Sequence, residues 1–175
     1  PSGTERIAPF LQSENDTVFG VAAQLAGLWK VESSRPAMEK ILNDESVPES
    51  RIKVALESLI SLGGEKTSSY LNQLFGNPKT TYMRKAMVVT TQLKVQPILA
   101  ARRAVKLLQG APEGMDKFGI YAAFLGNRGA TRALATEISQ VKLPEPIALQ
   151  GLQLAESSPT RPKELIAAIQ KAGGL

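Results

Sequence analysis

Apolar residues recur along the whole chain at steps of three and four, and short polar or Gly- and Pro-rich segments interrupt them. This spacing places apolar side chains on one face of an α-helix. The first such stretch follows Asn15-Asp16-Thr17, any of which can cap a helix, and contains Val18, Ala22, Leu25 and Trp29. The pattern predicts that these four apolar residues share one face of the first helix.

Nine more helices are predicted in the same way, with breaks such as Gly63-Gly64 and Gly110-Ala111-Pro112 between them. The apolar residues of the ten helices span 18–29, 37–42, 52–60, 70–75, 80–92, 96–109, 118–125, 134–141, 148–155 and 165–169. The one β-prone run, Val88-Val89-Thr90-Thr91, has flanks with helical spacing and is assigned to the fifth helix. The sixth helix is predicted to bury Ile98, Ala101, Val105 and Leu108.

The ten helices form five pairs, and each pair has a small residue in the middle of its first helix. These residues are Ala23, Ala55, Ala86, Ala122 and Ala148, at intervals of 32, 31, 36 and 26 residues. One hairpin cannot cover its own apolar face, whereas a stacked neighbour can, and a small residue at the crossing allows close approach. The pattern predicts an all-α fold, an α–α superhelix of about ten helices in five hairpins, as a single domain over residues 1–175. A compact irregular helical bundle is the alternative.

The repeat resembles degenerate HEAT repeats, so we expect a HEAT-like α-solenoid, although its period is short and the usual proline kink is missing. The C-terminal third contains the segments Lys142–Leu152, Ala155–Ser158 and Arg161–Leu165 and ends in Ala172-Gly173-Gly174-Leu175. This part resembles the helical-repeat region of large multidomain haem-binding proteins of planctomycetes, which join a dehydrogenase-like β-propeller, a HEAT-like stretch and a cytochrome c domain. The resemblance implies a module cut from an exported or periplasmic, electron-transfer-linked protein.

Two residue types that many catalytic and metal-binding sites require are absent from the chain. The chain has no cysteine and no histidine, which excludes disulfides, thiolate metal sites, imidazole bases and Ser-His-Asp triads. It also excludes a Cys-x-x-Cys-His haem attachment within this segment. We therefore expect no catalytic residue, no metal ligand and no cofactor here, and no apolar run is long enough for membrane insertion.

The net charge of +5 is compatible with an anionic partner. The candidate partner-binding patch consists of Arg84, Arg102, Arg103, Lys106, Arg128 and Arg132. Solvated helix faces are the alternative interpretation of these basic residues.

Three other sequence features give little indication of catalysis or ligand binding. Two acidic pairs, Asp44 with Glu45 and Glu113 with Asp116, fit capping and solvation better than catalysis or calcium binding. The segment Gly126–Gly129 fits a helix–helix turn better than a phosphate loop. The large aromatics Trp29, Tyr70, Tyr82 and Tyr121 are core or packing residues in one interpretation and ligand-binding residues in the other.

Three functions are compatible with these features. The leading hypothesis is a non-catalytic module that binds a protein or holds neighbouring domains of the same chain apart. The second is a nucleic-acid-binding domain with a basic concave face, for which the basic residues would have to converge on one surface. The third is a HEAT-like enzyme related to chromophore lyases, which would bind a tetrapyrrole.

Overall fold

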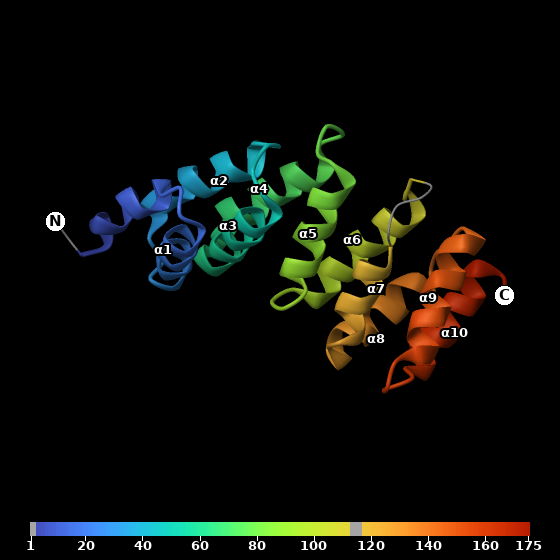
Figure 1. The fold of residues 1–175 in the computed structure, drawn as a ribbon. Helices are drawn as coiled ribbons and strands as arrows, with labels where there is room; N and C mark the ends of the chain where they lie inside the picture. The colour runs from blue at the N-terminus through green and yellow to red at the C-terminus, as the bar shows by residue number, and fades with distance from the viewer. Residues whose placement is uncertain (1–2, 113–116) are drawn as a thin grey trace. The chain divides into compact units, whose positions relative to one another are not determined.

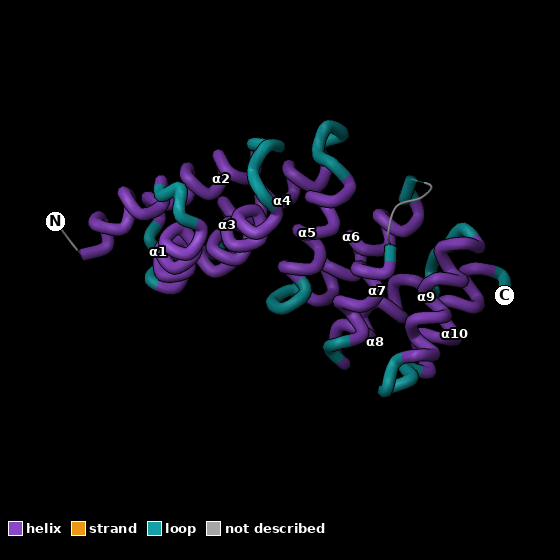
Figure 2. Tube along the Cα trace, in the orientation of Figure 1, coloured by secondary structure: helices purple, strands orange, loops and turns teal. Residues whose placement is uncertain are grey.

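The computed structural model describes residues 3–112 and 117–175, which are mostly helical (Figures 1 and 2). No strand occurs in these two ranges. The predicted all-α class is therefore confirmed for the described residues. Contacts divide the chain into two compact units, Pro1–Asn77 and Pro78–Leu175, which we call the N-terminal and C-terminal units.

Each of the ten predicted helices is present in the described residues. The N-terminal unit contains η1 (Gly3–Gln12), α1 (Asp16–Leu28), η2 (Glu32–Ser34), α2 (Arg35–Asn43), α3 (Glu49–Leu62) and α4 (Gly64–Gly76). The C-terminal unit contains α5 (Tyr82–Gln92), α6 (Pro97–Gln109), α7 (Phe118–Leu125), α8 (Arg128–Ile138), α9 (Glu145–Ser157) and α10 (Lys163–Gly173).

Local residue chemistry explains where several helices begin and end. The side-chain oxygen of Asn15 accepts hydrogen bonds from the backbone N–H groups of Thr17 (3.0 Å) and Val18 (3.1 Å), as an N-cap does. Asn127 caps α8 in the same way. Gly63 ends α3 with a φ of 70°, a conformation that favours glycine.

In the N-terminal unit, α1 and α2 both pack against α3. Gly27 lies where α1 comes close to α3. A Cβ atom added there would lie 2.9 Å from Cβ of Ser61 and 3.0 Å from the carbonyl oxygen of Ser58. The Ser58 hydroxyl also donates a hydrogen bond of 2.8 Å to the backbone oxygen of Ala23 on α1. Only glycine fits at this crossing, so Gly27 sets the distance between the two helices.

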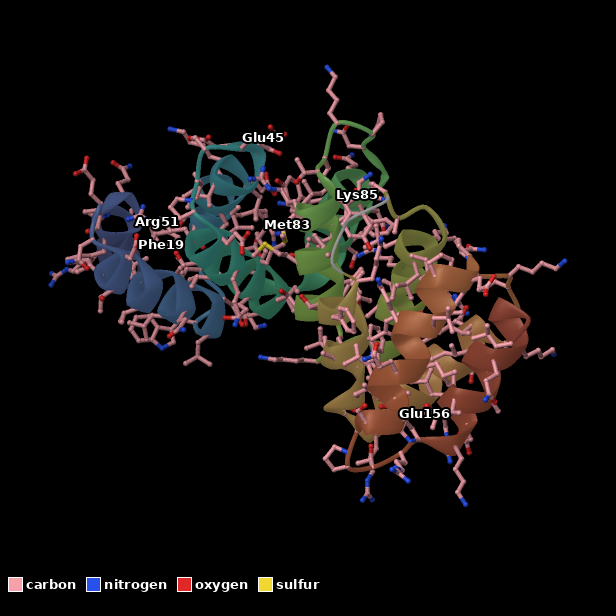
Figure 3. All side chains as sticks on the ribbon, turned by 45° about the vertical axis from the view of Figure 1, so that its right-hand side comes forward. Phe19, Glu45, Arg51, Met83, Lys85 and Glu156 are labelled. Atoms are coloured by element: carbon pink, nitrogen blue, oxygen red, sulfur yellow. The ribbon has the colours of Figure 1, made fainter. Side chains whose placement is uncertain are left out.

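Arg51 on α3 holds the start of α1 in place. Its guanidinium forms a 2.6 Å ion pair with Asp16 and donates hydrogen bonds to the backbone oxygens of Ser13 and Glu14. It also lies 4.9 Å from the centre of the Phe19 ring, beside which Figure 3 shows it. One cation therefore joins the η1–α1 connection, the first turn of α1 and the start of α3.

In the C-terminal unit, alternate helices stack on each other. Helix α7 packs against α5 and α9, and α8 packs against α6 and α10, while α5–α6, α7–α8 and α9–α10 form hairpin pairs (Figure 1). Contacts between neighbouring hairpins therefore occur throughout this unit. The continuous superhelix of five hairpins and the single domain over 1–175 stay predictions.

Tyr121 on α7 marks a close crossing in the C-terminal unit. A Cβ added at Gly151 on α9 would lie 2.7 Å from Cε1 of Tyr121, so the phenol ring occupies the space that a side chain would need. The Tyr121 hydroxyl donates a 3.3 Å hydrogen bond to the backbone oxygen of Ile147. Burial raises the pKa of Tyr121 well above its usual value, so this hydroxyl stays protonated and donates.

Three details of the helix predictions were wrong, and one segment was missed. Ile98 was expected to be buried and is 58% exposed. Ala122 was expected at a helix crossing, but its side chain is exposed because Tyr121 and Phe124 face inward. Val141 lies beyond the end of α8. The missed segment is η1, whose 3₁₀ geometry lacks the 3.6-residue period by which the helices were predicted.

We expect Gly27→Ala to destabilise the N-terminal unit by about 1–3 kcal/mol, because α1 and α3 must move apart to admit the methyl group. The measurement is urea unfolding followed by the fluorescence of Trp29, the chain's one tryptophan, which lies at the end of α1. Gly20→Ala on the same helix is the control. A Cβ there meets nothing within 4 Å, so the change should stabilise the unit by about 0.5–1 kcal/mol through helix propensity. Equal effects of the two changes would refute the close crossing.

Candidate binding surfaces

The structure separates the six basic residues of the predicted patch into two groups. Arg84 and Arg103 are buried, with 7% and 5% of their surface exposed. Arg103 donates a hydrogen bond to the side-chain oxygen of Gln92, and burial lowers the pKa of its guanidinium. These two side chains therefore belong to the interior of the C-terminal unit and present no charge to a partner.

The other four basic residues, Arg102, Lys106, Arg128 and Arg132, are exposed. Arg102 on α6 forms a 3.1 Å ion pair with Glu137 on α8. Arg132 on α8 forms a 3.4 Å ion pair with Glu164 on α10. The two pairs connect successive helices of one row, and because both are solvated they contribute little to stability.

The helical spacing of α6 distinguishes the buried Arg103 from the exposed Arg102 and Lys106. Ala100, Arg103 and Leu107 lie at steps of three and four, and all three are buried. Arg102 and Lys106 lie on the opposite face and are exposed. The spacing places Arg103 among core positions, although its charge suggested the surface.

An apolar groove lies between η1 and α1 in the N-terminal unit, with a volume of about 470 Å³. Its lining comes from residues 6, 7 and 10 of η1 and from residues 17, 18, 21, 22, 25 and 29 on α1 or at its C-cap. Among the described residues, Arg6 is the single charged one in this lining. Phe10, Val21 and Trp29 are each more than half exposed, so large apolar side chains here face solvent. We call this the η1–α1 groove.

The composition of α1 explains why this groove exists. From Val18 to Leu28 the helix contains one strongly polar residue, Gln24. One face of α1, which includes Phe19 and Ala23, is buried in the unit. The opposite face is also apolar, and η1 covers only part of it. Val18, Ala22, Leu25 and Trp29 do share a face, as predicted, but Trp29 is a solvent-facing residue at 52% exposure and not a core residue.

A second groove, of about 700 Å³, lies at the start of α8 and α10 in the C-terminal unit. We call it the α8–α10 groove. Arg128, Arg132 and Lys163 line it, and Glu164 is the one acidic residue that the described part of the chain contributes. Leu125, Pro159 and Pro162 contribute apolar surface, and the buried Leu165 lies beside them in the lining. Two of the six predicted patch residues, Arg128 and Arg132, thus meet in one groove, and Lys163 was not predicted.

The remaining sequence candidates have structural explanations. Asp44 accepts hydrogen bonds from the backbone N–H and the hydroxyl of Ser46, which stabilises a turn. The pair Glu113 and Asp116 lies outside the described residues. Within the described residues no group of three or more acidic side chains could hold a metal ion, and no helix there could cross a membrane.

Comparison with protein-family models, with curated protein sequences and with solved structures finds no match to this chain.

We expect Arg103→Ala to destabilise the C-terminal unit by about 1–3 kcal/mol, because it removes a buried side chain and leaves the Gln92 oxygen without this donor. Arg102→Ala, one residue earlier, removes only a solvated ion pair and should cost less than about 1 kcal/mol. Thermal unfolding followed by circular dichroism measures both. A larger loss from Arg102→Ala than from Arg103→Ala would contradict the burial of Arg103.

Proposed function

We propose that this chain is a protein-interaction module whose η1–α1 groove takes the apolar face of an amphipathic helix from a partner protein. The observation that carries the proposal is the contiguous apolar surface of that groove, with Phe10, Val21 and Trp29 half exposed. Contiguous exposed apolar surface is typical of a binding site in a water-soluble domain. Tryptophan in particular contributes strongly to protein interfaces.

The size and shape of the groove favour a helix as the occupant. Val18 and Trp29 lie eleven residues apart, which corresponds to roughly 17 Å of helix axis, or about three turns. Between them, Val21 and Leu25 continue the apolar stripe. A partner helix with apolar residues at i, i+3 or i+4 and i+7 presents a stripe of the same length.

The charge of the groove favours an acidic residue beside the apolar stripe of the partner. Arg6 is exposed and is the single charged residue that the described residues contribute to the lining. No ion pair of Arg6 is found within the described part of the chain. A carboxylate flanking the apolar face of a bound helix would pair with this guanidinium.

The nucleic-acid alternative is less well supported than protein binding. It needs the basic residues to converge on one surface, whereas Arg84 and Arg103 are buried and Arg102 already pairs with Glu137. The setting beside a cytochrome c domain stays a proposal from the resemblance of residues 113–175 alone. Sequencing the encoding gene tests it, since a downstream Cys-x-x-Cys-His is expected.

We expect a synthetic amphipathic helix of about 15 residues, with a Leu face and flanking Glu residues, to shift the emission of Trp29 to shorter wavelength on binding. Trp29 is the chain's single tryptophan and lies in the groove, so the shift reports occupation of this site directly. Val21→Asp places a charge in the apolar stripe and should weaken binding at least about tenfold.

The matched control is Leu149→Asp, which places the same charge on an exposed apolar residue of the C-terminal unit (48% exposed) and should leave the affinity unchanged. A peptide of the same composition in scrambled order should not bind. Equal weakening by the two substitutions would exclude the η1–α1 groove as the site. A shift of Trp29 emission with protein concentration alone, without peptide, would assign the groove to a second copy of this chain.

A further inference from the structure

We propose that the α8–α10 groove is a second, independent binding site, and that it takes an acidic peptide segment in which carboxylates alternate with apolar side chains. It lies in the C-terminal unit, it differs in chemistry from the η1–α1 groove, and it does not depend on the function proposed for that groove. The proposal rests on a cavity whose lining combines cationic and apolar side chains.

The charge of the groove is unbalanced. Three cations, Arg128, Arg132 and Lys163, face it together with one carboxylate, that of Glu164, among the residues that the structure describes. Glu164 pairs with Arg132 across 3.4 Å. Within the described residues Arg128 and Lys163 have no ion pair or side-chain hydrogen bond. Two positive charges in one groove are therefore available to a ligand.

The geometry favours carboxylates as the ligand groups. Arg128 and Arg132 are four residues apart on α8, so both guanidinium groups extend from the same side of that helix. A guanidinium group can bind a carboxylate through two parallel hydrogen bonds. Lys163 approaches the same groove from the start of α10.

The apolar part of the lining favours a peptide over a nucleic acid. Leu125, Pro159 and Pro162 supply the apolar surface of the groove that faces solvent, since Leu165 in its lining is buried. An apolar peptide side chain would bury this surface, whereas a phosphate backbone would leave it uncovered. None of the described residues that line the groove is aromatic, so they offer no stacking surface of the kind that single-stranded nucleic acids use.

The test is the fluorescence anisotropy of a labelled peptide that alternates Leu with Glu, titrated with the whole chain. Arg128→Ala combined with Lys163→Ala should weaken binding by about tenfold or more, because two charge-assisted contacts are lost. The matched control combines Lys106→Ala with Lys171→Ala. It removes the same two charges from exposed positions outside the groove lining and should change the affinity less than about threefold.

A third variant changes the affinity in the opposite direction. Glu164→Gln removes the carboxylate of the groove and frees Arg132, so the acidic peptide should bind more tightly. This result does not depend on loss of stability, because a damaged fold would weaken binding. Circular dichroism spectra establish that each variant is folded.

Three outcomes would overturn the proposal. Equal losses in the two double variants would show that only net charge attracts the peptide. Equal binding of a peptide with Gln in place of Glu would remove the role of the carboxylates. Tighter binding of a labelled oligothymidine, weakened by the same Arg128 and Lys163 changes, would make the groove a nucleic-acid site.

Discussion

The close approach of alternate helices is the constraint on which both units depend. The α-helices are between 8 and 14 residues long, and helices of this length are marginal in water on their own. Each helix must therefore bury a face against its neighbours. At two crossings a glycine, which has no side chain, lets the neighbouring helix come close. Gly27 does this between α1 and α3, and Gly151 does it beneath the ring of Tyr121.

Basic side chains take part in the packing of both units, and in the C-terminal unit some of them also leave positive charge at the surface. In the N-terminal unit, Lys30 donates hydrogen bonds to the last carbonyl oxygens of α3, those of Ser61 and Leu62, which have no partner within the helix. Arg35 donates to the oxygen of Gly63 just beyond them. In the C-terminal unit, Arg128 and Lys163 have no such structural role among the described residues, so their charge is available in the α8–α10 groove.

The helices were predicted well from the sequence because their signals are local. Apolar spacing, the capping residues before the first helix and the break at Gly63 each act within a few residues. The crossings were predicted less well, because which small residue meets a neighbouring helix depends on the rotation of the whole helix. Ala122 and Gly151 are both small, yet only Gly151 lies at a crossing. Arg128 and Lys163, 35 residues apart, meet in one groove only because α8 packs against α10.

The apolar character of α1 on both faces gives the binding hypothesis its physical basis. One face is buried within the unit, and the 3₁₀ segment η1, which contains Pro9, covers only part of the other. The uncovered part holds Trp29 and Val21 at 52% exposure each. Covering such surface yields about 25 cal/mol for each Å² removed from water. A partner helix would gain this free energy without any change in the packing of α1 on α3, because the two faces of α1 are separate.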